Sequence, residues 1–114
     1  MADCLFCKII AGQIPGTIVH QSDHIVAFKD TTPRAPTHVL VVPRRHIASL
    51  NDLGEEDDAL VGEMVRTAAA IAKKNGHAEG GYRAVFNCNA DAGQTVFHIH
   101  LHLLGGRKMT WPPG

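Results

Sequence analysis

The stretch of sequence that decides the fold is His98-Ile99-His100-Leu101-His102-Leu103-Leu104, in which three histidines alternate with apolar residues. Strict alternation over residues 96–104 predicts a β-strand, because successive side chains of a strand point to opposite faces. The three imidazoles should then form one row directed away from the core, with neighbours about 6.5–7 Å apart. The residues expected on the other face, under a helix, are Phe97, Ile99, Leu101 and Leu103.

This row of imidazoles can be interpreted in three ways: as an exposed polar face, as a metal site or as a catalytic surface. A straight strand is a poor metal site, because its outer histidines lie too far apart to share one ion. Asn87, Gly93 and Thr95 lie in or beside the polar loop that enters the strand, and they offer N–H and hydroxyl donors to an anion. Anion donors beside a neutral imidazole favour phosphoryl or nucleotidyl transfer, so catalysis is the preferred interpretation.

The rest of the sequence predicts one α+β domain over residues 1–114, built on a mostly antiparallel five-stranded sheet. Apolar residues at helical spacing predict a short helix near 5–10 and a long one over about 55–74. Residues 38–42 are almost wholly apolar, which predicts a strand covered on both faces. Further strands are expected at 17–20, 25–28 and 82–86, and irregular structure at 31–36 and 111–114.

Composition indicates an ordinary globular chain. It has 45% hydrophobic and 19% charged residues, and 11 basic residues balance 11 acidic ones. This balance gives no reason to expect a nucleic acid or an anionic membrane as a partner. The sequence also shows neither a signal-peptide pattern nor an apolar run long enough to span a bilayer. Three cysteines do not make a disulfide framework, so we expect a cytoplasmic protein.

The chain resembles the histidine triad (HIT) superfamily, which is named for the pattern that residues 98–104 show. Its end, Trp111-Pro112-Pro113-Gly114, and the segment Pro36-Thr37-His38 resemble the nucleotide-binding branch, the purine nucleoside phosphoramidases. The resemblance implies a HIT-like fold, a homodimer whose sheet extends across a two-fold axis, purine nucleotide substrates, and no cofactor required for catalysis. The other segments that carry it are 6–10, 14–15, 27–30, 35–36, 93–97 and 104–107.

Matched residue by residue, the resemblance also implies roles in the site. His100 would attack the α-phosphorus and form a nucleotidyl-histidine that water then hydrolyses. His102 and His38 would contact phosphate oxygens and direct proton transfer. Asp30 would bind the ribose hydroxyls, although on the residues alone it is equally well a turn residue. The remaining contacts are Asn87, Gly93 and Thr95 for phosphate, Phe6, Ile9 and Phe28 for the base, His98, and Trp111 reaching toward the partner's site.

The Cys4-x-x-Cys7 pair has two interpretations. Some bacterial members of the superfamily join such a pair to two histidines around zinc, and the matching histidines here are His46 and His98. That set would be a closed, structural Cys₂His₂ site. The phosphoramidase branch, however, commonly lacks both cysteines and the metal. In that case Cys4 and Cys7 would be small buried residues at a helix start.

Two rival functions stay open. A dinucleoside polyphosphate hydrolase is another branch of the superfamily, although the Trp-Pro-Pro-Gly end argues against it. A nucleotide-binding adaptor with incidental hydrolysis would use the same pocket. A nucleotidyl transferase is disfavoured, because the transferase relatives carry Gln where this chain has His102.

Overall fold

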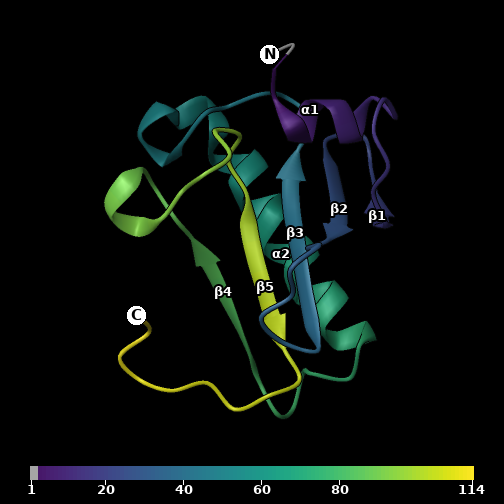
Figure 1. Ribbon diagram of the computed structural model, residues 1–114, viewed down its shortest axis with the longest axis vertical. Helices are drawn as coiled ribbons and strands as arrows, with labels where there is room; N and C mark the ends of the chain where they lie inside the picture. The colour runs from purple at the N-terminus through teal and green to yellow at the C-terminus, as the bar shows by residue number, and fades with distance from the viewer. Residues whose placement is uncertain (1–2) are drawn as a thin grey trace.

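The computed structural model describes residues 3–114, and its centre is a five-stranded antiparallel sheet in the order β1-β2-β3-β5-β4 (Figure 1). The predicted α+β class is confirmed, with five strands, one long helix and one short helix. The helices are α1 (Leu5–Ile10) and α2 (Asp58–Lys74), and 3₁₀ turns occupy Leu50–Asp52, Glu55–Asp57 and Ala90–Ala92. The strands are β1 (Ile18–Gln21), β2 (Ile25–Lys29), β3 (Thr37–Pro43), β4 (Tyr82–Phe86) and β5 (Leu101–Gly105).

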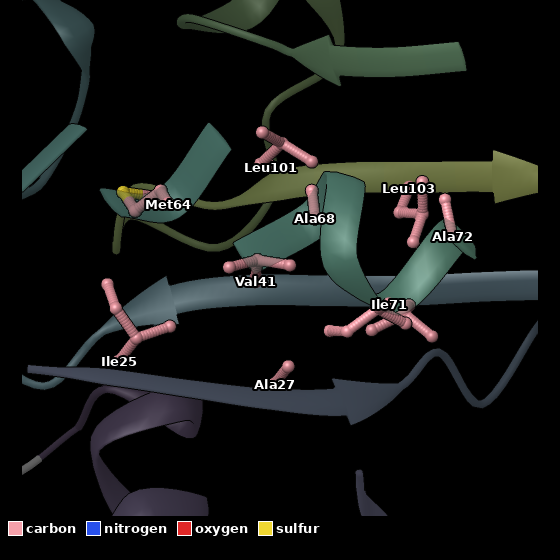
Figure 2. Packing of buried hydrophobic residues seen from close by; sticks show 10 residues of the cluster. Ile25, Ala27, Val41, Met64, Ala68, Ile71, Ala72, Leu101 and Leu103 are labelled. Atoms are coloured by element: carbon pink, nitrogen blue, oxygen red, sulfur yellow. The ribbon is translucent and has the colours of Figure 1, made fainter. Parts of the chain in front are cut away.

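The long helix α2 covers one face of the sheet (Figure 1). The acidic turn Glu55–Asp57 precedes it, and Lys73 and Lys74 lie in its last turn, as the helix dipole favours. Its buried residues Met64 and Ile71 pack among strand residues, which confirms the predicted apolar stripe (Figure 2). No helix between residues 3 and 114 has the length and apolar character needed to cross a membrane.

The short helix α1 covers part of the opposite face. Phe6 and Ile9 of α1 pack against Phe28 and Leu40, which point away from α2 because side chains alternate along β2 and β3. β3 is therefore covered on both faces, as predicted, and Thr37 alone among its residues is not buried. The face that carries α1 is also the face toward which His102 projects, since its neighbours Leu101 and Leu103 pack under α2.

The histidine strand is shorter than predicted. β5 begins at Leu101, and the chain bends over residues 96–98, so the three imidazoles do not form one row on a straight strand. The register pairs Val41 with Leu101, and extending it would place Pro43 opposite Ile99. Proline has no N–H for the ladder, which therefore stops. The Ile99 N–H instead donates to the Ile47 carbonyl at 2.7 Å.

The bend also changes which side chains are buried. Leu101 and Leu103 pack against α2 as predicted, but Phe97 is 50% exposed, and Ile99 is buried outside the α2 cluster. The expectation that the imidazoles project away from the core is wrong as well. His98 is fully buried and His100 is only 9% exposed, because α1 and the loops around it cover them.

Candidate active site

His100 lies where the chain enters β5, and neighbouring groups hold its ring. Its Nδ1 lies 2.8 Å from the main-chain oxygen of His98. A carbonyl only accepts, so Nδ1 carries the proton and Nε2 of the neutral ring keeps its lone pair. The Phe6 ring packs edge-on against it, with centroids 5.0 Å apart. Burial lowers the pKa of His100, so the ring is neutral near pH 7 and its Nε2 has a lone pair that can act as a nucleophile.

His38 and His102 form a pair with defined proton positions. The His38 Nδ1 accepts the Arg34 main-chain N–H at 3.0 Å, and burial lowers the pKa of His38, so the neutral ring carries its proton on Nε2. That Nε2 donates to the His102 Nδ1 at 2.9 Å, which leaves the His102 proton on its own Nε2. Burial and the neighbouring imidazoles lower the pKa of His102 to about 4. His102 is therefore a neutral N–H donor beside His100.

Asp30 follows β2 and uses its two carboxylate oxygens differently. Oδ1 accepts the Thr32 main-chain N–H at 2.8 Å and the Thr32 hydroxyl at 3.1 Å, so the turn role considered above is real. Oδ2 lies 3.5 Å from the His38 Nε2. Burial raises the pKa of Asp30, but the Thr32 hydrogen bonds and the neighbouring imidazoles outweigh burial and lower it overall. Asp30 is therefore an ionised acceptor beside the histidine pair.

His100, His102 and Asp30 meet in one hollow of about 670 Å³, called here the triad hollow. One wall is apolar and comes from α1, β2 and β3, while the polar lining consists of one carboxylate, one lysine, three threonines and two imidazoles. Such a hollow suits a ligand with a flat ring at one end and an anionic, electrophilic group at the other. The lining includes Phe6, Ile9, Phe28, Leu40, Asp30, Thr95, His100 and His102.

A second cluster, of two thiols and two imidazoles, lies next to the triad hollow. The His98 Nε2 donates to the Pro43 carbonyl at 2.7 Å, which leaves its Nδ1 lone pair facing Cys4 and Cys7 at 3.4 and 3.5 Å. The His46 Nδ1 lies 3.5 Å from the Cys7 sulfur. All four ligand atoms lie within 4.8 Å of one another. Tetrahedral zinc spaces sulfur and nitrogen by about 3.6 Å, so this donor set fits zinc.

Comparison with known proteins places this arrangement in a family. Residues 3–111 match the family model described as scavenger mRNA decapping enzyme C-term binding. A HIT family hydrolase from Legionella pneumophila has the same fold, with a TM-score of 0.97 and 53% identity over 98% of this chain and 100% of that one. The chain belongs to the histidine triad (HIT) family.

Other HIT proteins are similarly close along their whole length. A HIT family hydrolase from Clostridium thermocellum is 43% identical, with a TM-score of 0.93 and 96% of each chain covered. The purine nucleoside phosphoramidase of Escherichia coli K12 is 47% identical over 107 residues, which are 94% of this chain and 90% of that one. The predicted family is therefore confirmed.

Several of the residues predicted for the site of this HIT protein lie outside the triad hollow. His98 faces the cysteines, and His38 and Asn87 lie on the far side of His102, where they line a separate hollow. Gly93 ends the 3₁₀ turn with φ +82°, a backbone conformation that favours glycine, and it does not line the triad hollow. Trp111 is 83% exposed and does not line it either.

Other residues of the HIT site were missed from the sequence. Leu40 lies in the apolar wall because the β3–β5 register pairs it with His102, a pairing that no local pattern reveals. Arg34, Arg83 and Arg107 come from three distant segments and meet beside the histidine pair. No spacing in the sequence indicates their meeting, since only the sheet order places β4 and the β3 entry next to β5.

Proposed function

We propose that this HIT hydrolase cleaves purine nucleoside 5′-phosphoramidates to a nucleoside monophosphate and an amine, through a covalent nucleotidyl-histidine on His100. The observation that carries the proposal is the His100 Nε2, which keeps its lone pair because Nδ1 donates to the His98 carbonyl. This nitrogen shares a hollow with an apolar slot and an ionised carboxylate. The relative named purine nucleoside phosphoramidase supports the substrate class.

In the first step the His100 Nε2 attacks the α-phosphorus and the P–N bond breaks. The departing nitrogen takes the electron pair and needs a proton, which the His102 Nε2–H supplies. The His38 Nε2–H stays on His38 and donates to the His102 Nδ1 at 2.9 Å, so it keeps the His102 proton on Nε2 until transfer and stabilises the negative charge then left on the His102 ring. The hydroxyl of Thr95 and the donors of its loop contact the phosphate oxygens.

In the second step water hydrolyses the intermediate. The His102 Nε2, now a base, takes a proton from the water as the oxygen bonds to phosphorus. The His100–P bond breaks and its electrons return to Nε2, which restores the neutral nucleophile. All groups in both steps are side chains of this chain, so we propose no cofactor for the chemistry.

The apolar slot and Asp30 would select the nucleoside. Phe6 and Phe28 offer aromatic surface to a purine, with Ile9 beside them. The Asp30 Oδ2 is available to a ribose hydroxyl, since Oδ1 alone is bound by Thr32.

Incubation of the protein with adenosine 5′-phosphoramidate tests this function. AMP and ammonia should appear in equal amounts over many turnovers. Faster cleavage of diadenosine tetraphosphate would favour the dinucleoside polyphosphate hydrolase instead. Tight binding of AMP with no turnover of either substrate would favour the adaptor.

We also propose that Cys4, Cys7, His46 and His98 hold a structural zinc ion. All four residues are partly or fully buried, and their sulfur–nitrogen spacings suit tetrahedral coordination. The bound ion would supply folding energy by tying α1 to the two loops that carry the histidines. We also propose the cytoplasm as the location, where thiols stay reduced and available to a metal.

We propose that the protein is a homodimer joined through β4. The sheet has two edges, β1 and β4. The register of β1 shifts between Ile18 and His20, and such an irregularity blunts an edge strand. β4 is regular over five paired residues and can meet its own copy across a two-fold axis. Sedimentation velocity should therefore give twice the 12.3 kDa chain mass, and a substitution to proline in β4 should give the monomer.

The pH profile should show a late loss of activity in acid. Burial lowers the pKa of His100, so the nucleophile is protonated only below the ordinary histidine value of 6.5. We expect kcat/KM at pH 6.5 to keep more than half of its value at pH 8, after correction for uncatalysed hydrolysis at each pH. An acid limb with its midpoint above pH 6.5 would contradict this.

A further inference from the structure

A second hollow lies beyond His102, on the side away from the apolar slot. It has a volume of about 360 Å³ and shares Asp30 and His102 with the triad hollow. Three arginines line it: Arg34 from the loop before β3, Arg83 from β4, and Arg107 after β5. We call it the arginine hollow. The segment after β5 turns back toward β4 (Figure 1). Its residues Met109 and Pro113 form part of the wall of the hollow.

The arginine hollow holds an uncompensated positive charge. Within residues 3–114, none of its three guanidinium groups forms an ion pair with a carboxylate, and Asp30 supplies the single carboxylate of the wall. The whole chain has a formal net charge of zero, so this excess is local. A concave surface with an excess of positive charge attracts anionic ligands.

Two of the arginines are held in place by the main chain. Arg83 donates to the Thr110 carbonyl at 2.8 Å, and the Arg107 Nε donates to the Arg34 carbonyl at 2.8 Å. The Arg34 guanidinium makes no hydrogen bond or ion pair with the described residues. A guanidinium has several N–H donors in one plane, so all three groups keep donors for a ligand. Fixed guanidiniums suit carboxylate and phosphate oxygens in particular.

The position of the arginine hollow relative to the nucleophile matches the path of a leaving group. Displacement at phosphorus sends the leaving group away from the attacking atom, roughly in line with it. His100 lines only the triad hollow, whereas His102, the proposed proton donor, lines both. The amine therefore leaves past His102 and toward the arginines.

We propose that the arginine hollow binds an anionic group on the leaving amine, so that this enzyme prefers phosphoramidates of amines that carry a carboxylate, such as an N-linked amino acid. The inference rests on the proposed function and specifies the substrate class of the same site. A carboxylate and a phosphate both present small, negatively charged oxygens to the guanidinium groups. A phosphate on the leaving group is therefore the other ligand that the arginine hollow could bind.

Turnover of matched substrates tests the inference. Adenosine 5′-phosphoramidates of alanine and of alanine amide differ only in the carboxylate. We expect wild type to favour the carboxylate by about tenfold in kcat/KM, chiefly through KM, because a charge-assisted contact of this kind contributes about 1.5 kcal/mol. Arg34→Gln should bring the ratio of kcat/KM for the two compounds close to one. Arg66→Gln, on the exposed face of α2, is the matched control and should keep the preference.

Binding separates this inference from the proposed reaction. In His100→Ala protein the carboxylate compound should bind about tenfold more tightly than the amide, and Arg34→Gln in that background should abolish the difference. If wild type turns over neither compound but this difference in Kd persists, the reaction is wrong and the anion site stands. Equal Kd values overturn the anion site. A larger effect of Arg34→Gln on diadenosine tetraphosphate than on the alanine compound would overturn the carboxylate assignment in favour of phosphate.

Discussion

Replacement of His100 by alanine should reduce kcat for adenosine 5′-phosphoramidate by at least about 10³-fold, because the variant lacks the free imidazole lone pair of the proposed nucleophile. The neighbouring His102 is the other imidazole in that hollow, but its Nδ1 is occupied by the His38 proton and its Nε2 carries a proton. Wild type quenched without acid should show an adenylylated species by intact mass spectrometry. The variant should show none.

The control for this substitution is His20→Ala. His20 lies on β1 and lines neither the triad hollow nor the arginine hollow, so its loss should leave kcat unchanged. Both variants should keep the wild-type circular dichroism spectrum. Residual turnover well above about 0.1% of the wild-type rate, or an adduct on the His100→Ala protein, would show that the nucleophile is another group.

Removal of zinc should lower the melting temperature by about 10 °C or more. A structural zinc site contributes several kcal/mol to folding, and about 1 kcal/mol shifts the midpoint of a domain of this size by a few degrees. The measurement is thermal unfolding of the reduced protein with and without a chelator, together with the zinc content per chain. Readdition of Zn²⁺ should restore the midpoint.

Cysteine variants localise that effect. Cys7→Ser should lower the zinc content and the melting temperature together, whereas Cys88→Ser should change neither, since Cys88 is not part of the cluster. Protein that contains no zinc as purified, binds none when it is added, and melts identically with chelator would refute the metal site. The cysteines would then be packing residues at the start of α1.

The sequence predicted most of the fold because its patterns are local. The apolar stripe of α2 and the continuous apolar run of β3 each report the burial of their own side chains, and both predictions hold. The predicted length of the histidine strand was wrong because of a residue on the neighbouring strand. Alternation continues through residues 96–104, but Pro43 on the neighbouring strand ends the ladder, and nothing within the segment records that.

The candidate site, like the fold, could be predicted from the sequence only in part. Position in the motif was enough to find His100 and His102, which the structure brings together with ring centroids 4.8 Å apart. The tautomers of His100 and His38 could not be predicted, because they depend on contacts with the His98 carbonyl and the Arg34 N–H. The arginine hollow could not be predicted from the sequence either, because only the order of the strands in the sheet brings Arg34, Arg83 and Arg107 together.

His98 links the two clusters through different parts of one residue. Its ring belongs to the cysteine cluster, while its carbonyl sets the proton position of His100. The carbonyl is main chain, so every amino acid at position 98 offers it, whereas only histidine offers the ring. The ring of the first histidine of the motif is therefore expendable for the proposed nucleophile, whereas the proposed metal site needs it. We expect a relative without the cysteine pair to accept another residue at this position and to keep its activity. The motif thus combines one requirement of the proposed catalysis, the main-chain carbonyl, with one requirement of the proposed metal site, the imidazole ring.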